Sequence, residues 1–142
     1  MRKAFSILID LSLICPALSS QTREQQPAIP KQVGIRHPMM LPLECPSGDC
    51  SLLSGVPQTA GMMSGFVRLQ PGKSVGWHST GAHEEALVIL SGRGEAQVEG
   101  QPDRPIAAPM MAYFPPATRH NVLNNSEASL EYVYLVAPAQ PR

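Results

Sequence analysis

The feature that most constrains this sequence is a series of short apolar segments separated by closely spaced glycine and proline turns. Seven segments have the composition of strands: residues 63–69, 73–79, 85–91, 94–99, 110–114, 119–123 and 129–136. The segment 94–99 alternates small or apolar residues with polar ones, as expected for a strand with one buried face. No helical stretch lies between these segments, and 15 prolines and 11 glycines argue against a helical bundle. The sequence therefore predicts an all-β fold, a sandwich or closed barrel of antiparallel strands.

Length and charge restrict the class of protein further. A chain of 142 residues is enough for one domain with a single core. Lysine plus arginine number 11 and aspartate plus glutamate number 11, so the formal net charge is zero. This balance argues against nucleic acid as the main partner because there is no basic excess to neutralise phosphates.

Residues 1–20 have the layout of a secretory signal peptide. Arg2 and Lys3 give a positive start, residues 4–17 are mostly apolar, and small residues precede a polar run. The apolar stretch is too short and too interrupted to span a bilayer comfortably, and the bulky Ile14 disfavours lipid attachment at Cys15. We therefore expect a secreted or periplasmic protein, with no stable membrane insertion after the signal is removed.

Residues 21–60 are predicted to form an extended N-terminal arm ahead of a barrel at residues 61–138. The arm is rich in proline, and residues 33–43 are expected to add an edge strand or to wrap around the barrel. Cys45 and Cys50 follow the signal, and an even pair in an exported chain predicts a disulfide. A metal or redox pair is the rival interpretation, which the lack of further cysteines disfavours.

The segment 85–91 is apolar on both faces, so its outer side needs a cover. Either the arm or a second copy of the chain would provide one. A homodimer is therefore one of the two expected arrangements.

The chemistry of the predicted barrel is concentrated in three histidines and one glutamate. His78 and Thr80 share one face of their strand, and Glu85 shares its face with core residues and so points inward. His83 lies in a turn, and His120 follows a Pro-Pro turn. Two imidazoles and one carboxylate aimed into one barrel suit a divalent metal, with positions left open for a small-molecule ligand.

Each of these residues also has a purely structural interpretation. His78 can cap the barrel with a hydrogen bond, and His83 can form a solvent-exposed ion pair with the acids beside it. Glu85 is harder to explain in this way because a buried carboxylate needs a partner. Tyr113 and Tyr132 can line a ligand pocket or simply pack in a wall of the barrel.

Two stretches of the sequence resemble the two motifs of the cupin family. Four residues match the first motif in register: Gly72, His78, Glu85 and Gly92. Three residues match the second motif: Pro115, His120 and Asn124. Pro109 and Ala117 stand where that motif usually has glycine. With their flanks the motifs cover residues 62–137, and the resemblance implies a small antiparallel jelly-roll barrel, in agreement with the strand count.

The resemblance places the family's second metal-binding histidine at Thr80, and threonine is a weak metal ligand. Three arrangements stay open: a site of His78, Glu85 and His120, the same site with His83 added, or a site without metal. The resemblance implies manganese, iron, nickel, zinc or copper as the ion, and the sequence does not choose among them.

Two functions from different classes stay open. One is a metal-dependent enzyme that acts on a small molecule as an oxygenase, decarboxylase or isomerase, with Tyr113 and Asn124 shaping the pocket. The other is a non-catalytic module that binds a small ligand or sugar without metal. The sequence offers no separate acid, base or nucleophile beyond the metal ligands, so it identifies no catalytic residue.

Overall fold

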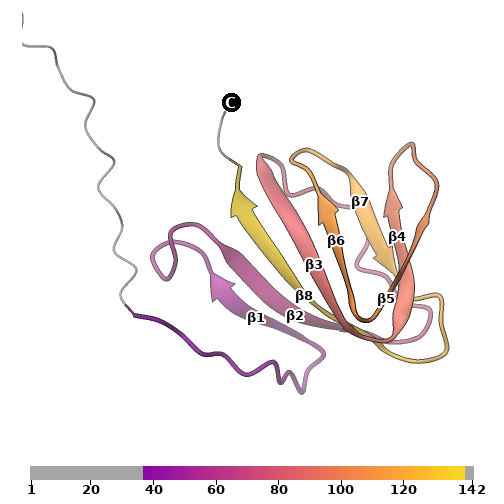
Figure 1. Cartoon of the computed structure of the whole chain (residues 1–142), viewed down its shortest axis with the longest axis horizontal. Coiled ribbons are helices and arrows are strands. Elements are labelled where there is room, and N and C mark those ends of the chain that lie inside the picture. The colour runs from indigo at the N-terminus through magenta and orange to yellow at the C-terminus, as the bar shows by residue number, and fades with distance from the viewer. Residues whose placement is uncertain (1–36, 140–142) are drawn as a thin grey trace, which may run out of the picture. The chain divides into compact units, whose positions relative to one another are not determined.

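A computed structural model describes residues 37–139 (Figure 1). The predicted signal peptide and the first part of the arm lie outside these residues. The described residues form eight strands: β1 (Asp49–Ser54), β2 (Met63–Leu69), β3 (His83–Ser91), β4 (Arg93–Val98), β5 (Arg104–Ala107), β6 (Met110–Phe114), β7 (His120–Leu123) and β8 (Leu130–Pro138). Within residues 37–139 there is no helix of the length and hydropathy needed to cross a membrane.

The strands form two antiparallel sheets, which confirms the prediction of an all-β jelly roll. The order in the five-stranded sheet is β1-β2-β8-β3-β6, and the order in the three-stranded sheet is β5-β4-β7. β8, the last of the described strands, lies between β2 and β3 (Figure 1). β8 pairs with β2 without interruption, from Met63↔Val136 to Leu69↔Leu130. The strands at the two ends of the barrel segment are therefore hydrogen-bonded neighbours.

The core is built from inward residues of both sheets. The five-stranded sheet contributes Leu87, Ile89 and Leu130, each at most 1% exposed, and the three-stranded sheet contributes Ile106 and Val122. Burial of one such side chain stabilises the fold by about 1.5–3 kcal/mol. Alternation along β3 puts Glu85 on the same buried face as Leu87 and Ile89, as the sequence predicts.

The segment 73–79 is not a continuous strand, which corrects the prediction. It forms only two isolated bridges, Ser74 with Leu123 and His78 with His120. The chain takes one more residue between these bridges than β7 does, so one residue must bulge out of register. Gly76 accommodates it at φ +86°, a left-handed conformation that side-chain-bearing residues rarely adopt.

Two strands are absent from the prediction. β5 has four residues and contains Pro105, so it lacks the alternation that marks a strand, and its proline is tolerated because β5 is an edge strand. β1 is an edge strand of the five-stranded sheet. The sequence predicts an edge strand at residues 33–43 as one of two possibilities. The described part of that segment, residues 37–43, is not a strand and instead lines a surface groove with Leu53 and Val133.

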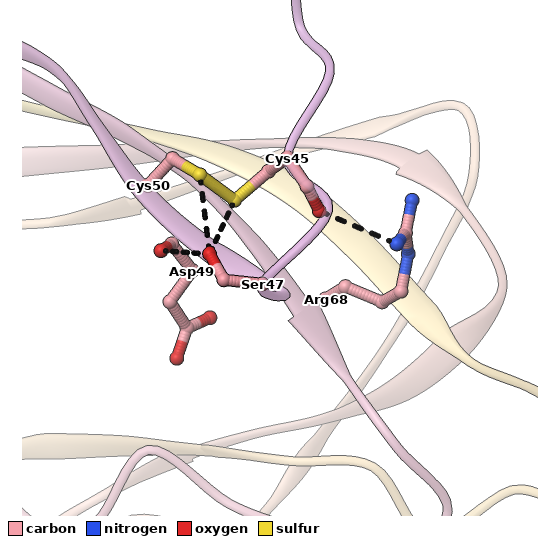
Figure 2. The surroundings of a disulfide bond; sticks show 5 residues. All are labelled: Cys45, Ser47, Asp49, Cys50 and Arg68. Atoms are coloured by element: carbon pink, nitrogen blue, oxygen red, sulfur yellow. Dashed lines mark hydrogen bonds between the residues drawn. A yellow bond between two sulfur atoms is a disulfide. The ribbon is translucent and has the colours of Figure 1, made fainter.

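The predicted disulfide is present and closes a tight loop before β1 (Figure 2). Cys45 is 2% exposed, and its Cα lies 5.8 Å from that of Cys50. Ser47 lies inside the loop, with its hydroxyl oxygen 3.4 Å from the Cys45 sulfur and 3.5 Å from the Cys50 sulfur (Figure 2). Arg68 of β2 donates its backbone N–H to the Gly48 carbonyl at 2.7 Å, so the bridged loop is attached to the sheet.

The outer face of β3 and β6 is only partly covered. Leu90 is 40% exposed and Met111 is 65% exposed. The groove that the described arm residues line lies over β1, β2 and β8 instead, with Ser64 and Val133 in it. A second copy of the chain therefore stays a prediction for this face.

Candidate metal centre

His78 and His120 are brought together by the backbone. Each donates its backbone N–H to the carbonyl of the other at 2.9 Å, which makes them a directly opposed cross-strand pair. Their ring centroids are 4.4 Å apart. The bulge at Gly76 ends just before this pair, and it lets Val75 and His78, which strict alternation would place on opposite faces, line one cavity.

Glu85 reaches the two histidines from the other sheet. Its Oε2 lies 3.3 Å from His120 Nε2 and 3.9 Å from His78 Nε2. One ligand atom from each of the three residues lies within 4.8 Å of the others. The Glu85 and His120 side chains are 7% and 1% exposed, whereas that of His78 is 42% exposed. The cluster is therefore closed on its inner side and open at His78.

Both histidine rings are oriented by backbone carbonyls. The Nδ1 of His78 lies 2.9 Å from the Gly76 carbonyl oxygen, and the Nδ1 of His120 lies 3.0 Å from that of Thr118. Because a carbonyl oxygen only accepts, Nδ1 must carry the proton, and a neutral ring then has its lone pair on Nε2. This second hydrogen bond is the arrangement usual for histidines that bind metals.

Two atoms at the centre of the cluster lack a hydrogen-bonding partner. The Oε2 of Glu85 and the Nε2 of His120 are both buried and make no hydrogen bond of good geometry, although they are 3.3 Å apart. Buried polar atoms without a well-formed hydrogen bond are rare in protein interiors because they are unfavourable there. A cation would satisfy a carboxylate oxygen and an imidazole lone pair together, so the donors present fit a divalent transition metal.

The His120 ring is also held by an aromatic contact. Phe114 stacks on it with centroids 3.9 Å apart and the planes at 6°. Burial acts to lower the pKa of His120, but the Glu85 side chain and the Thr118 carbonyl outweigh burial and raise that pKa above its ordinary value. The carboxylate therefore attracts positive charge to this position, whether a proton or a metal ion supplies it.

The turn before β7 sets the path of the chain into His120. Thr118 donates its backbone N–H to the Pro115 carbonyl at 3.3 Å, and Ala117 has φ +59°. A proline followed by a residue with positive φ is the pattern of a type II turn, in which glycine is preferred at the position of Ala117. The sequence departs from the family motif at this residue, and the backbone nevertheless keeps the conformation that glycine would take.

A cavity of about 250 Å³ opens beside the cluster. Its polar lining includes Thr80 and Tyr132, two of the predicted pocket residues, together with His78 and Glu85. Tyr134 also lines it, and its ring packs over Gly65, where an added Cβ would lie 2.5 Å from the ring. Four valines complete the wall: Val67, Val75, Val122 and Val136.

Three other predicted site residues lie elsewhere. His83 is outside the cluster, with its Nδ1 3.2 Å from the Thr80 carbonyl oxygen in a tight turn. Tyr113 points away from the cavity, is 57% exposed and donates its hydroxyl to Glu84 at 3.1 Å. Asn124 is fully buried but serves the turn between β7 and β8: its amide donates to the carbonyls of Leu69 and Ala128, both at 2.8 Å.

The wall residue Val75 was not anticipated from the sequence. Alternation from His78 places Val75 on the opposite face, and only the bulge turns it inward. The signal that could have revealed it is Gly76, since an isolated glycine in a strand pattern often marks a bulge.

Comparison with known proteins bears on the family and the fold. A family model, the cupin domain, matches residues 65–136, which is half of the chain. No curated protein matches the sequence.

Several solved structures are similar to this chain. A predicted oxalate decarboxylase from Thermotoga maritima is 27% identical, with a TM-score of 0.52 over 54% of this chain and 66% of that one. A Cupin 2 conserved barrel domain protein from Salinispora arenicola is 25% identical, with a TM-score of 0.54 over 72% of this chain and 87% of that one.

An uncharacterized conserved protein with a double-stranded β-helix domain from Klebsiella pneumoniae is 19% identical, with a TM-score of 0.60 over 72% of this chain and 91% of that one. At that identity the likeness concerns the fold alone. The chain spans just under two thirds of the length of the Thermotoga protein.

Proposed function

This chain belongs to the cupin family, and on that premise we propose that its barrel holds one divalent transition metal and binds a small molecule beside it. His78, Glu85 and His120 would be the ligands. His83 would not, because it is outside the cluster and its ring is hydrogen-bonded within its own turn.

The observation that carries this proposal is the pair of buried, unpartnered atoms, Glu85 Oε2 and His120 Nε2, at the centre of the cluster. Backbone carbonyls hold both histidines in the tautomer with a free Nε2 lone pair. A site that only stabilised the fold would be expected to pair these atoms with hydrogen-bond donors of the protein.

The proposed reaction class is a metal-dependent transformation of a small oxygen-bearing molecule, by an oxygenase, decarboxylase or isomerase. Bound metal would supply Lewis-acid or oxygen chemistry at this position. Glu85 offsets one positive charge, the histidines stay neutral, and the valine wall excludes water from the reacting part of the substrate. The resemblance at 27% identity to a predicted oxalate decarboxylase supports a reaction of this kind.

The alternative is a module that binds a small ligand or sugar without metal and without turnover. In favour of it, no general acid, base or nucleophile apart from the cluster and the two tyrosines lines the cavity in the part of the chain that the structure describes. The two proposals differ in whether purified protein contains metal.

Export belongs to the same proposal. A disulfide in the protein indicates an oxidising compartment, since such bonds rarely persist in the cytosol. The layout of residues 1–20 agrees with a secreted or periplasmic location.

The deciding experiment is metal analysis of protein purified without added metal. We expect about one transition-metal ion per chain in the wild type and less than a tenth of that in His120→Ala. His83→Ala is the matched control and should keep its metal. Glu85→Gln serves as a second variant of nearly unchanged shape, and circular dichroism checks that each variant is folded.

Wild-type protein that stays free of metal, even after incubation with excess Mn, Fe, Ni, Zn and Cu ions, would leave the metal-free binding module as the function. Loss of metal from His83→Ala would add His83 to the ligand set.

A further inference from the structure

We propose that the cavity takes a small, singly charged oxygen chelator with an apolar body, and that the Tyr132 hydroxyl donates the hydrogen bond that orients it. This inference rests on the proposed function, because it concerns the molecule that lies beside the bound metal.

The charge at the site favours a monoanion. A divalent ion held by Glu85 and two neutral histidines leaves a net charge of about plus one. Among the described residues that line the cavity there is no lysine or arginine. A singly charged chelator would bring the site to neutrality, whereas a dianion would leave an unpaired negative charge against apolar walls, which is strongly unfavourable.

The walls restrict size and chemistry. The cavity of about 250 Å³ corresponds to roughly eight water molecules at their liquid volume. Apart from the cluster, Thr80 and the tyrosines, it is lined by four valines. The part of the ligand that does not coordinate the metal should therefore be short and apolar, because it would replace water at the valine side chains.

Tyr132 is placed to orient such a ligand. It lies on β8 opposite Val67 and Ile89, is 2% exposed, and still lines the cavity. The described part of the chain offers its hydroxyl no hydrogen bond. A tyrosine hydroxyl carries its proton at neutral pH, so the Tyr132 hydroxyl can donate a hydrogen bond to a ligand oxygen in the cavity.

Tyr134 is the second cavity tyrosine, and it is less suited to this role. It is half-buried, and its hydroxyl end lies over the backbone of Gly65. We therefore assign orientation of the ligand to Tyr132.

The charge of the ligand is tested with oxalate and oxamate, which have nearly the same shape but differ by one unit of charge. Cobalt(II)-loaded protein is titrated with each, and binding is followed by the visible absorption of cobalt. Each affinity is divided by that chelator's affinity for free cobalt ion in the same buffer. We expect this normalised affinity to favour oxamate over oxalate by at least tenfold, and equal or reversed preference would overturn the proposal.

The apolar body is tested in the same way with pyruvate and 2-oxo-3-methylbutanoate, two monoanions that differ by an isopropyl group in place of a methyl group. The larger molecule should bind at least threefold more tightly. Weaker binding than pyruvate would contradict an apolar subsite.

Tyr132→Phe tests the orienting hydroxyl, with Tyr113→Phe on the outer face as the control. We expect about fivefold weaker oxamate binding in Tyr132→Phe, with cobalt stoichiometry unchanged, and no change in Tyr113→Phe. Unchanged oxamate affinity in Tyr132→Phe, or loss of its cobalt, would refute the assigned role. Failure of the proposed function is seen separately, as wild-type protein that takes up no cobalt before any chelator is added.

Discussion

His78 and His120 face each other as a hydrogen-bonded pair, each backbone N–H donating to the other's carbonyl at 2.9 Å. This backbone pairing brings together two candidate ligands from distant parts of the sequence, and the contacts of their rings with the Gly76 and Thr118 carbonyls then orient them. Glu85 completes the cluster from the facing sheet, with its Oε2 3.3 Å from His120 Nε2. The cluster is therefore organised before any ligand binds.

Ala117→Gly should stabilise the protein. Ala117 has φ +59°, a conformation that disfavours a residue with a Cβ by about 1–2 kcal/mol. The added flexibility of glycine in the unfolded chain offsets about 0.4–1 kcal/mol of that gain. We expect a net increase of about 1 kcal/mol in the free energy of unfolding, measured by urea denaturation.

Ala86→Gly is the matched control for this change. Ala86 lies within β3, where glycine should destabilise by about 0.5–1 kcal/mol. Destabilisation by Ala117→Gly would show that the positive φ is not a source of strain.

Asn124→Ala should lower the free energy of unfolding by about 3 kcal/mol, without a direct effect on the cavity. The amide of Asn124 donates to the carbonyls of Leu69 and Ala128, and its oxygen accepts from Ser126. Removing it leaves buried backbone carbonyls unpaired. The neighbouring Asn125 is exposed, so Asn125→Ala should change the free energy of unfolding by less than about 0.5 kcal/mol. Similar urea midpoints for both variants would contradict the role assigned to Asn124.

The ion pair between Arg68 and Glu131 should make stability depend on acid. The hydrogen bond from Arg68, at 2.6 Å, is the main cause that lowers the pKa of Glu131, with a further contribution from Ser91. Because the pKa of Glu131 is lower in the folded than in the unfolded protein, its carboxylate stabilises the fold at pH values above the unfolded-state pKa. That stability is lost as the pH falls through the lowered value.

The free energy of unfolding of Glu131→Gln should therefore decrease less than that of the wild type as the pH falls from about 6 to about 3. The difference from wild type should not exceed about 1 kcal/mol, because both side chains are partly exposed. Parallel pH profiles of the free energy of unfolding for the two proteins would refute this prediction.

Removal of the Cys45–Cys50 bridge should lower stability by about 2 kcal/mol, as expected for a loop this short. A variant with both Cys45→Ala and Cys50→Ser tests this without leaving a free thiol. Intact mass before and after reduction of the wild type shows directly whether the bond has formed. The loop supplies none of the three cluster residues, so metal content should be unaffected, and loss of metal from this variant would contradict the ligand set.

A second copy of the chain is the predicted cover for the outer face of β3 and β6. Met111 is 65% exposed and Leu90 is 40% exposed, and exposed apolar side chains on one face of a sheet are candidates for an interface. Light scattering after size exclusion should give a dimer for wild type and a monomer for Met111→Lys. Met40→Lys on the arm, where the side chain is 89% exposed, is the control and should leave the dimer intact. A monomeric wild type at high concentration would end this prediction.

The sequence predicts the cluster well because two simple rules act on it. Alternation along β3 assigns Glu85 to the buried face with Leu87 and Ile89, and the motif spacing links His78 to His120. The same rules miss Val75, because the bulge at Gly76 shifts the alternation by one residue and no periodicity reveals that shift in advance.

Asn124 shows a different limit. Its position matches a motif that accompanies metal binding, which suggested a place in the pocket. The structure uses its short amide as a local turn-former, because asparagine readily bonds to backbone groups a few residues away. β5 was missed because a four-residue edge strand with a proline carries too little pattern to be distinguished from a loop.

Glu85 and His120 belong to opposite sheets, so an ion bound by both would link the two layers of the domain. On the proposed function, the melting temperature should then rise with the concentration of free metal, as mass action requires. Where free metal is scarce, the protein would be less stable, and the interface between its two sheets would lose the link that the ion provides.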